Sequence, residues 1–176
     1  ITSSRKSRSV WVNASSGAWT YTLDNAAHQA LAAGESHDET FTVTVTDDEG
    51  ATATQDVTIT VSGTNDGPVI TSSAQSGAVQ EDTTLTATGT VTSSDVDNGA
   101  TASYSGNATG DYGSFAVTAA GVWTYTLANA AHQNLAQGES HLETFTVTVT
   151  DDFGATATQD VTITVTGTND GPVITS

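Results

Sequence analysis

Cysteine and methionine are absent from the sequence, proline occurs twice, and only three of the 176 residues are Lys or Arg. Without cysteine, no disulfide can brace a small domain, and neither a thiolate metal site nor a thiol nucleophile is available. Three bases stand against 20 acids, so the formal net charge is −17, which excludes the usual electrostatic binding of nucleic acid. This charge favours cations as partners.

Long apolar runs and catalytic motifs are also missing. No stretch of about 18 apolar residues is present, so we expect no membrane insertion. The many serines do not lie in a GxSxG motif. Most acids of residues 35–66 recur 104 positions later, and an active site duplicated in every repeat is unusual. We therefore expect that the protein is not an enzyme.

What the sequence does contain is a tandem repeat. Residues 17–72 and 121–176 are identical at 49 of 56 positions, at an offset of 104. Solenoid repeats usually span about 20 to 50 residues, so a period near one hundred with short strands favours β-sandwich modules in tandem. We therefore predict an all-β protein built from such modules.

The two repeats are not equally complete. The expected domains are a first repeat truncated at its N-terminus over residues 1–66, a complete second repeat over 67–170, and the start of a next repeat at 171–176. Residues 1–4 match residues 70–73, so the first repeat lacks about 35 residues. The basic segment RKSRS that follows suggests a fragment boundary, a deletion or a non-native insertion, and we assign it no function.

The truncation has a consequence for partners. A repeat without its early strands leaves sheet edges unpaired and one face of its core uncovered. We therefore predict pairing with another chain, or strand exchange with another copy through the truncated first repeat, for which the terminal segment GPVITS is a candidate strand.

The strands follow from alternation of apolar residues with threonine. Phe41, Val43 and Val45 share one face, and after the acidic turn DDEG the residues at 57, 59 and 61 do the same. This pattern predicts an antiparallel hairpin on one side of a sandwich, and it recurs in the second repeat.

A second alternating segment carries the large aromatic residues. Trp19, Tyr21 and Leu23 recur as Trp123, Tyr125 and Leu127, which by their period fill the core. A carbohydrate-stacking platform is the alternative for these rings. We expect a turn of helix to follow, capped by Asn25 or Asn129, and we expect the segment SSAQSGA at 72–78 to be a loop.

Oxygen-bearing side chains gather in turns where two repeats meet. Hard divalent cations take six to eight oxygen ligands, which Asp, Glu, Asn and backbone carbonyls supply. Like-charged carboxylates about 4 Å apart repel by on the order of 4 kcal/mol at an effective dielectric of about 20, unless a cation lies among them. The candidate calcium ligands are Asn65, Asp66, Glu81, Asp82, Asp95 and Asp97.

A turn-forming role is the alternative for these acids, since Asp, Asn and Gly favour turns on backbone grounds alone. For Asp47 and Asp48 in the DDEG turn, the two interpretations are equally supported, and both residues stay candidate calcium ligands. His28 and His37 recur at equivalent turns without a second His or Cys nearby in sequence, which favours structural or solvent-facing roles over a zinc site.

The motifs WTYTL, LAxGES, ETFTVTVTD, DxGATATQ and GTNDGP together resemble the VCBS repeat of very large bacterial surface and secreted proteins, many of them RTX-type adhesins. The resemblance implies tandem cadherin-like and Ig-like β-sandwiches with calcium near the repeat junctions. It also implies that Glu81 corresponds to the early-strand Glu of cadherins, that Asp95 and Asp97 form the DxD turn, and that Asn65 with Asp66 form the linker. The cadherin DRE motif is missing from the first repeat, where Asp47 or Asp48 are the available substitutes.

Together these features predict a structural extender module of a large bacterial surface adhesin. In this hypothesis, calcium stiffens a secreted, extracellular row of repeats, whose partners are the neighbouring repeats of the same chain, and the row projects a ligand-binding region from the cell. The alternative is a calcium-dependent module that binds carbohydrate or another cell surface through its Trp and Tyr rings and acidic loops.

Overall fold

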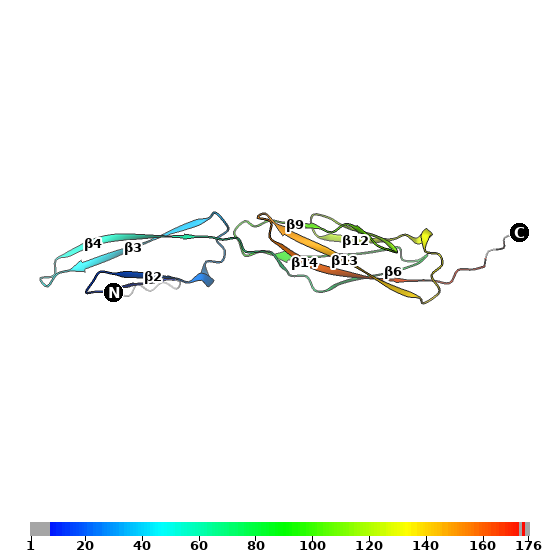
Figure 1. Ribbon diagram of the computed structural model, residues 1–176, viewed down its shortest axis with the longest axis horizontal. Helices are drawn as coiled ribbons and strands as arrows, with labels where there is room; N and C mark the ends of the chain where they lie inside the picture. Colours follow the sequence, from blue (N-terminus) through cyan, green and yellow to red (C-terminus); the bar gives the residue numbers. More distant parts are fainter. Residues whose placement is uncertain (1–7, 173, 175–176) are drawn as a thin grey trace. The chain divides into compact units, whose positions relative to one another are not determined.

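The structure is a computed structural model that describes residues 8–172 and residue 174 (Figure 1). The chain forms two compact units. The first comprises residues 1–66 with the short segment 96–99, and the second comprises residues 67–95 and 100–176. Over the described part of the chain, no helix is long and apolar enough to cross a bilayer. The prediction of an all-β fold is confirmed.

The second unit is a sandwich of two four-stranded sheets. One sheet has the order β10 (Ala108–Thr109), β11 (Gly113–Val117), β12 (Val122–Leu127), β7 (Thr86–Thr90). The other has the order β6 (Gln75–Gln80), β14 (Thr156–Thr166), β13 (Ser140–Asp151), β9 (Ala102–Ser105). A short pair, β5 (Val69–Ile70) with β8 (Ser93–Ser94), lies beside them.

The core of the second unit lies between these sheets and follows the alternation of the sequence. On β12, Trp123, Tyr125 and Leu127 are buried while the threonines between them are exposed. On β14, residues 161, 163 and 165 are buried in the same way. Threonine on the outer face keeps each strand soluble, and its β-branched side chain suits the pleated backbone.

Strand β6 is the element that the sequence analysis placed wrongly. Residues 72–78 were expected to form a loop, but Gln75–Gln80 form a strand that pairs in parallel with β14. The segment is rich in Gly, Ser and Gln, so its local sequence favours a turn. Pairing with β14 and burial of Val79 outweigh that preference.

The turn after the aromatic strand also differs from its prediction. Each unit has a single 3₁₀ turn there, η1 (Asn25–Ala27) and η2 (Asn129–Ala131). The flanking residues Asp24 and Ala128 make no side-chain cap, and Asn25 and Asn129 lie inside the turn rather than before it. Asn129 is used elsewhere, in the site described below.

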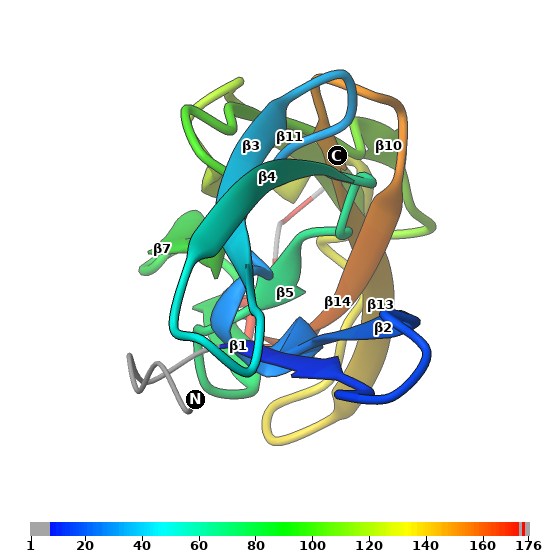
Figure 2. The same ribbon diagram turned by 90° about the vertical axis from the view of Figure 1, so that its left-hand side faces the viewer.

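The first unit contains two hairpins among its described residues. One pairs β1 (Arg8–Val12) with β2 (Trp19–Leu23), and the other pairs β3 (Ser36–Thr46) with β4 (Thr52–Ser62). Figures 1 and 2 show these hairpins as two separate layers, and the rings of Tyr21 and Phe41 meet between them at 6.0 Å. The strand β1 was not foreseen, because it begins in the basic segment that carried no alternation.

The core positions of the first unit are more open than the equivalent positions of the second unit. Trp19 is 45% exposed, whereas its equivalent Trp123 is 1% exposed. Val45 is 66% exposed, whereas Val149 is fully buried. The side chains are identical, so the difference comes from what covers them. In the second unit β6, β7 and β9 flank these hairpins, and the described residues of the first unit contain no counterparts of those strands.

Candidate cation sites

The first candidate site lies where β6 ends in the second unit. The backbone N–H of Glu81 donates to Thr166 O at 3.0 Å, which continues the pairing of β6 with β14. The Oε2 of Glu81 accepts the backbone N–H of Thr168 at 3.1 Å. Glu81 is fully buried, and its other oxygen, Oε1, has no hydrogen-bond partner within the described part of the chain.

Asp82, next in sequence, is held by a network of amide side chains. Its Oδ1 accepts hydrogen bonds from Asn129 Nδ2 at 2.8 Å and from Gln133 Nε2 at 3.0 Å, and its own N–H donates to Asn129 Oδ1 at 2.9 Å. The residue has a φ of +59°, in the left-handed region that Asp tolerates better than most residues. Hydrogen bonds from Gln133 and Asn129 lower the pKa of Asp82, so its carboxylate stays charged.

Asp170 completes this group, which we call the Glu81 cluster: Glu81, Asp82 and Asp170. Desolvation raises the pKa of Asp170, which is an exposed residue, and the negative charges of Glu81 and Asp82 raise it further. Asp170 is the repeat equivalent of Asp66, at the offset of 104. The second unit therefore holds its own linker Asp beside Glu81.

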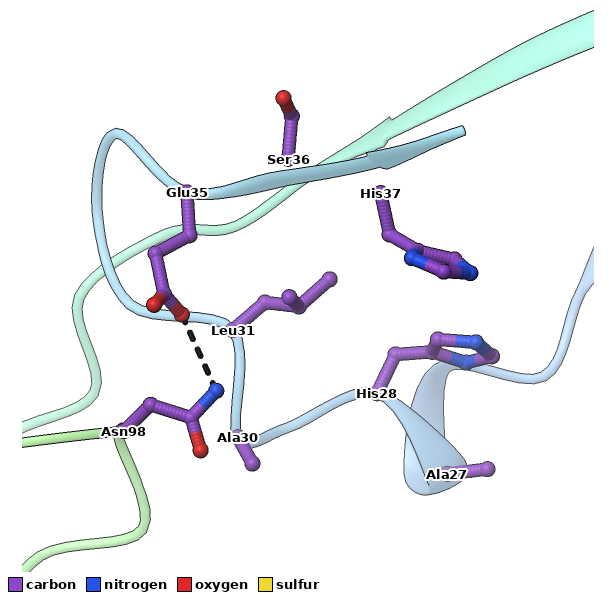
Figure 3. A pocket seen from close by; sticks show the side chains of 8 residues that line it. All are labelled: Ala27, His28, Ala30, Leu31, Glu35, Ser36, His37 and Asn98. Carbon is purple, nitrogen blue, oxygen red and sulfur yellow. Dashed lines mark hydrogen bonds between the residues drawn. The ribbon is translucent and has the colours of Figure 1, made fainter. Parts of the chain in front are cut away.

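The second candidate site lies at the end of the first unit. The backbone N–H of Asp66 donates to Asp97 Oδ2 at 2.9 Å. Asn98 donates through Nδ2 to Glu35 Oε2 at 3.1 Å, and its backbone N–H donates to Ala30 O at 2.9 Å (Figure 3). Asp97 is 7% exposed and Asn65 is half-buried. We call Asn65, Asp66 and Asp97 the Asp97 cluster.

The remaining predicted ligands lie elsewhere. Asp95 is half-buried and belongs to the second unit. Asp47 and Asp48 lie in the turn between β3 and β4, whose opposite ends pair Thr46 with Thr52 and Ser36 with Ser62. Eleven strand residues at about 3.3 Å each separate this turn from the linker by roughly 36 Å, so the structure does not bring Asp47 or Asp48 to Asp66.

The carboxylate of Asp47 is used within its own turn. Its Oδ1 accepts the backbone N–H groups of Glu49 at 3.0 Å and Ala51 at 2.8 Å. Asp151 makes the equivalent bonds in the second unit. For Asp47 this geometry favours the turn-forming interpretation over calcium binding. Asp48 is exposed in the same turn.

Within each unit, the structure shows which predicted ligands lie together. Glu81 and Asp82 lie with Asp170, whereas Asp97 lies with Asp66. Among the residues described, no three His, Asp or Glu groups are arranged to hold a metal ion by themselves. Each cluster therefore offers only part of the six to eight oxygens that calcium takes.

Four residues that line these clusters were not recognised as site residues from the sequence: Glu35, Asn98, Asn129 and Gln133. They sit in segments that look like ordinary turns. The repeat did contain one signal for Asp170, because this residue is the equivalent of the predicted linker ligand Asp66 in the complete unit.

A pocket of about 430 Å³ lies beside the Asp97 cluster, lined in part by His28, Glu35, His37 and Asn98 (Figure 3). In the second unit, the ring of Tyr112 occupies the corresponding place, with its centroid 4.9 Å from that of His132 and 4.7 Å from that of His141. The pocket thus corresponds to the place that an aromatic ring fills in the complete unit.

Each unit also buries a glutamate that the sequence analysis did not single out. Glu143 accepts hydrogen bonds from the Tyr125 hydroxyl and from the Tyr112 N–H, and Glu39 accepts one from the Tyr21 hydroxyl at 3.2 Å. Burial raises the pKa of Tyr125, and the hydrogen bond to Glu143 and its charge raise it further. These pairs join the two layers of each unit.

Comparisons with known proteins agree with this architecture. The model of the bacterial cadherin-like domain matches residues 65–167, and the model of the bacterial Ig domain matches residues 1–60. No curated protein matches the chain.

Among solved structures, the chain is similar to extracellular cadherin domains 1–4 of protocadherin gamma B7, with 18% identity and a TM-score of 0.54 over 96% of this chain and 41% of that one. It is also similar to extracellular cadherin domains 1–5 of protocadherin gamma B2, with 18% identity and a TM-score of 0.53 over 96% of this chain and 32% of that one. The chain spans less than half of the length of these proteins, and at this identity the likeness shows the fold.

The cadherin-like match covers more than half of the sequence and coincides with the complete sandwich of the second unit. The prediction of cadherin-like and Ig-like β-sandwiches is therefore confirmed, and the chain belongs to the bacterial cadherin-like domain family.

Proposed function

We propose that the chain is a structural extender segment of a large bacterial surface adhesin, in which calcium stiffens a row of β-sandwich repeats. The observation that carries the proposal is Oε1 of Glu81, a fully buried carboxylate oxygen with no hydrogen-bond partner in the described part of the chain. Burying a charged oxygen without a partner costs free energy, which a bound cation would offset.

The Glu81 cluster supplies part of the oxygen ligands that a hard divalent cation takes. It contributes carboxylates from Glu81, Asp82 and Asp170, and the charges of the first two already raise the pKa of the third. A cation among them would convert this repulsion into attraction. Calcium is favoured over a transition metal, because the donors are oxygens and the cluster contains neither Cys nor His.

The Asp97 cluster is the complementary part of such a site. It has the linker residues Asn65 and Asp66 together with Asp97, and Asp95 stands two residues earlier in the chain. It has no counterpart of Glu81 among the described residues. In an array of complete repeats, each junction would combine a Glu81-type group and a linker Asp with the DxD turn of the next repeat, which together supply enough oxygens.

Length is the proposed contribution of each module. A strand of eleven residues, such as β14, extends about 36 Å, so many repeats in a row would carry a ligand-binding region far from the cell. The partners in this role are the neighbouring repeats of the same chain, and the setting is secreted or on the bacterial surface. The VCBS and RTX-type context rests on the sequence motifs.

The alternative function, calcium-dependent binding of carbohydrate, requires an exposed aromatic platform. Trp123 is buried in the complete repeat. Trp11 and Trp19 are exposed in the first unit, but Trp19 pairs with Val12, so Trp11 points to the opposite face of the same hairpin. Two rings on opposite faces cannot form one platform, and this observation favours the structural role.

Differential scanning calorimetry of the whole chain in calcium and in EGTA tests the proposal. A ligand that binds only the folded state at a hundredfold excess over its Kd adds about 2.7 kcal/mol of stability. For a domain of about 100 residues, that corresponds to a rise in Tm of roughly 10 °C or more. An unchanged Tm in calcium would remove the stiffening mechanism, and specific calcium-dependent binding to a glycan array would favour the alternative.

A further inference from the structure

The open side of the first unit has a defined counterpart in the second. In the second unit, β6 and β7 follow one another through a short turn closed by the bridge between Gln80 and Thr84. β6 joins the edge of β14, and β7 joins the edge of β12 in the opposite sheet. This strand pair, residues 75–90, therefore closes one side of the sandwich across both sheets.

The strand pair forms the surface against which the Trp123 ring packs, and we call this surface the seat. Gly89 lies directly opposite Trp123 in register, and a Cβ at Gly89 would lie only 2.5 Å from Trp123 Cζ2. A Cβ at Gly77 would lie 3.1 Å from Cη2 of the same ring. Gln75 Oε1 accepts the indole N–H at 3.0 Å, and the Thr88 hydroxyl donates to Trp123 O at 2.6 Å. The ring thus packs against two glycines and donates one hydrogen bond, while Thr88 binds the backbone carbonyl of the same residue.

The first unit presents the same receiving surface without the seat. Its residues 19–23 and 57–61 are identical to residues 123–127 and 161–165. Trp19 is 45% exposed and Leu23 is 37% exposed, against 1% and 4% for Trp123 and Leu127. The edges of β2 and β4 that correspond to the ones used by β7 and β6 have no strand beside them among the described residues.

We propose that the first unit is an acceptor for a β-strand pair of the type of residues 75–90 that lies outside the described residues. Because the receiving residues are the same in both units, the strand pair that covers one has the right side chains for the other. The donor would pair in parallel with β4 and antiparallel with β2, and would seat Trp19 between its two glycines.

The number of such strand pairs in each copy of the chain limits which segment can be the donor. Each copy carries one such strand pair, which already covers its own Trp123. Exchange between two intact copies would therefore cover Trp19 in one molecule and uncover Trp123 in the other, with no net gain of buried apolar area. The donor is instead a segment of this pattern that is not engaged in a sandwich of its own.

A synthetic peptide of residues 75–90, mixed with the full 176-residue chain, tests the proposal. We expect a blue shift of tryptophan emission as Trp19 becomes buried, and no such shift in the Trp19→Phe variant. We also expect slower amide hydrogen exchange at residues 19–22 and 57–62, the edges that the donor would pair with.

The peptide has a matched pair of variants. Gly89→Val places a side chain in the seat of the ring and should weaken binding by roughly tenfold or more. Thr90→Val places the same valine at the neighbouring, exposed position, where it only replaces a hydroxyl by a methyl group, and should leave binding nearly unchanged. Three outcomes would overturn the proposal: no binding, equal binding of the two variants, or self-association of the chain that already buries Trp19.

Discussion

Glu81 is well placed in the fold, but its hydrogen-bonding capacity is only partly used within the described part of the chain. Its backbone extends the pairing of β6 with β14, and one carboxylate oxygen accepts an N–H from Thr168. The other oxygen is buried without a hydrogen bond in the described part of the chain. A side chain that served stability alone would do better as an apolar residue of the same size, because a buried charge without a partner is costly.

The Glu81→Gln substitution separates the two roles of this residue. Without calcium we expect the variant to be as stable as the wild type or more stable, because it removes a buried charge. With calcium, the variant should lose most of the stabilisation that the wild type gains, because the ligand has lost its charge. Calorimetry in EGTA and in calcium measures both effects, with Asp48→Asn as the control at an exposed turn. A variant that keeps the full calcium response would contradict the role of Glu81.

Asp170 provides a reporter of the same cluster. Its folded-state pKa is raised, so Asp170 favours the folded state at low pH, and that contribution is lost as pH rises from its unfolded to its folded pKa. The pKa of Asp82 is lowered, so Asp82 contributes in the opposite sense, and its stabilisation is lost as pH falls through its folded pKa.

We expect calcium to lower the pKa of Asp170, because a cation offsets the charges of Glu81 and Asp82. Asp82→Asn should also lower it, although part of the rise should remain because desolvation is its main cause. Carboxyl-carbon NMR titration measures this pKa directly, with Asp160→Asn as a control on the outer part of β14. A calcium-independent pKa would argue that the ion does not bind at this cluster.

At the scale of elements, the two repeats act as internal controls for each other. Val45 on β3 and Val149 on β13 occupy the same repeat position, yet the first is 66% exposed and the second is fully buried. Val149 lies opposite Tyr104 of β9, and β3 has no such neighbour among the described strands. Burial is thus decided by the third strand rather than by the hairpin.

Matched Val→Ala substitutions measure that effect. Val149→Ala should destabilise the second unit by about 2 kcal/mol, because it removes two buried methyl groups and leaves a small cavity. Val45→Ala should change the stability of the first unit by less than about 0.5 kcal/mol, as is usual for exposed positions. Chemical denaturation followed at unit-specific amides by NMR distinguishes the two. Equal losses in both units would mean that Val45 is covered in solution.

At the scale of the whole molecule, the two units are predicted to unfold separately. The first has its hairpins incompletely covered, whereas the second has a closed core between two four-stranded sheets. We expect two transitions in calorimetry, with the first unit unfolding at the lower temperature, because it buries less apolar area. Calcium should raise the upper transition, since the Glu81 cluster belongs to the second unit. A single cooperative transition would contradict this assignment.

Much of the fold was predictable from the sequence, because its signals are local and repeated. Alternation of Thr with Val, Ile and Phe identifies the long hairpins, and the offset of 104 identifies the repeat. Strands β6 and β1 were missed. Each forms by pairing with another strand, and its own residues show no alternation that would predict a strand.

The candidate site was predictable only in its residue types. Asp, Glu and Asn in turns indicated a hard cation, and the unpartnered oxygen of Glu81 agrees with that chemistry. Which acids lie together could not be predicted. Asp82 and Asp170 are 88 positions apart, and the parallel pairing of β6 with β14 places the ends of those strands side by side.

By itself, the sequence determined the strand pattern, the repeat and the anionic character of the protein, since each depends only on residue type and spacing. The tertiary structure alone decided which identical residues are buried, as Trp19 and Trp123 show, and which carboxylates share a cluster. The physical reason is that burial and charge proximity depend on neighbouring strands, which come from distant parts of the chain.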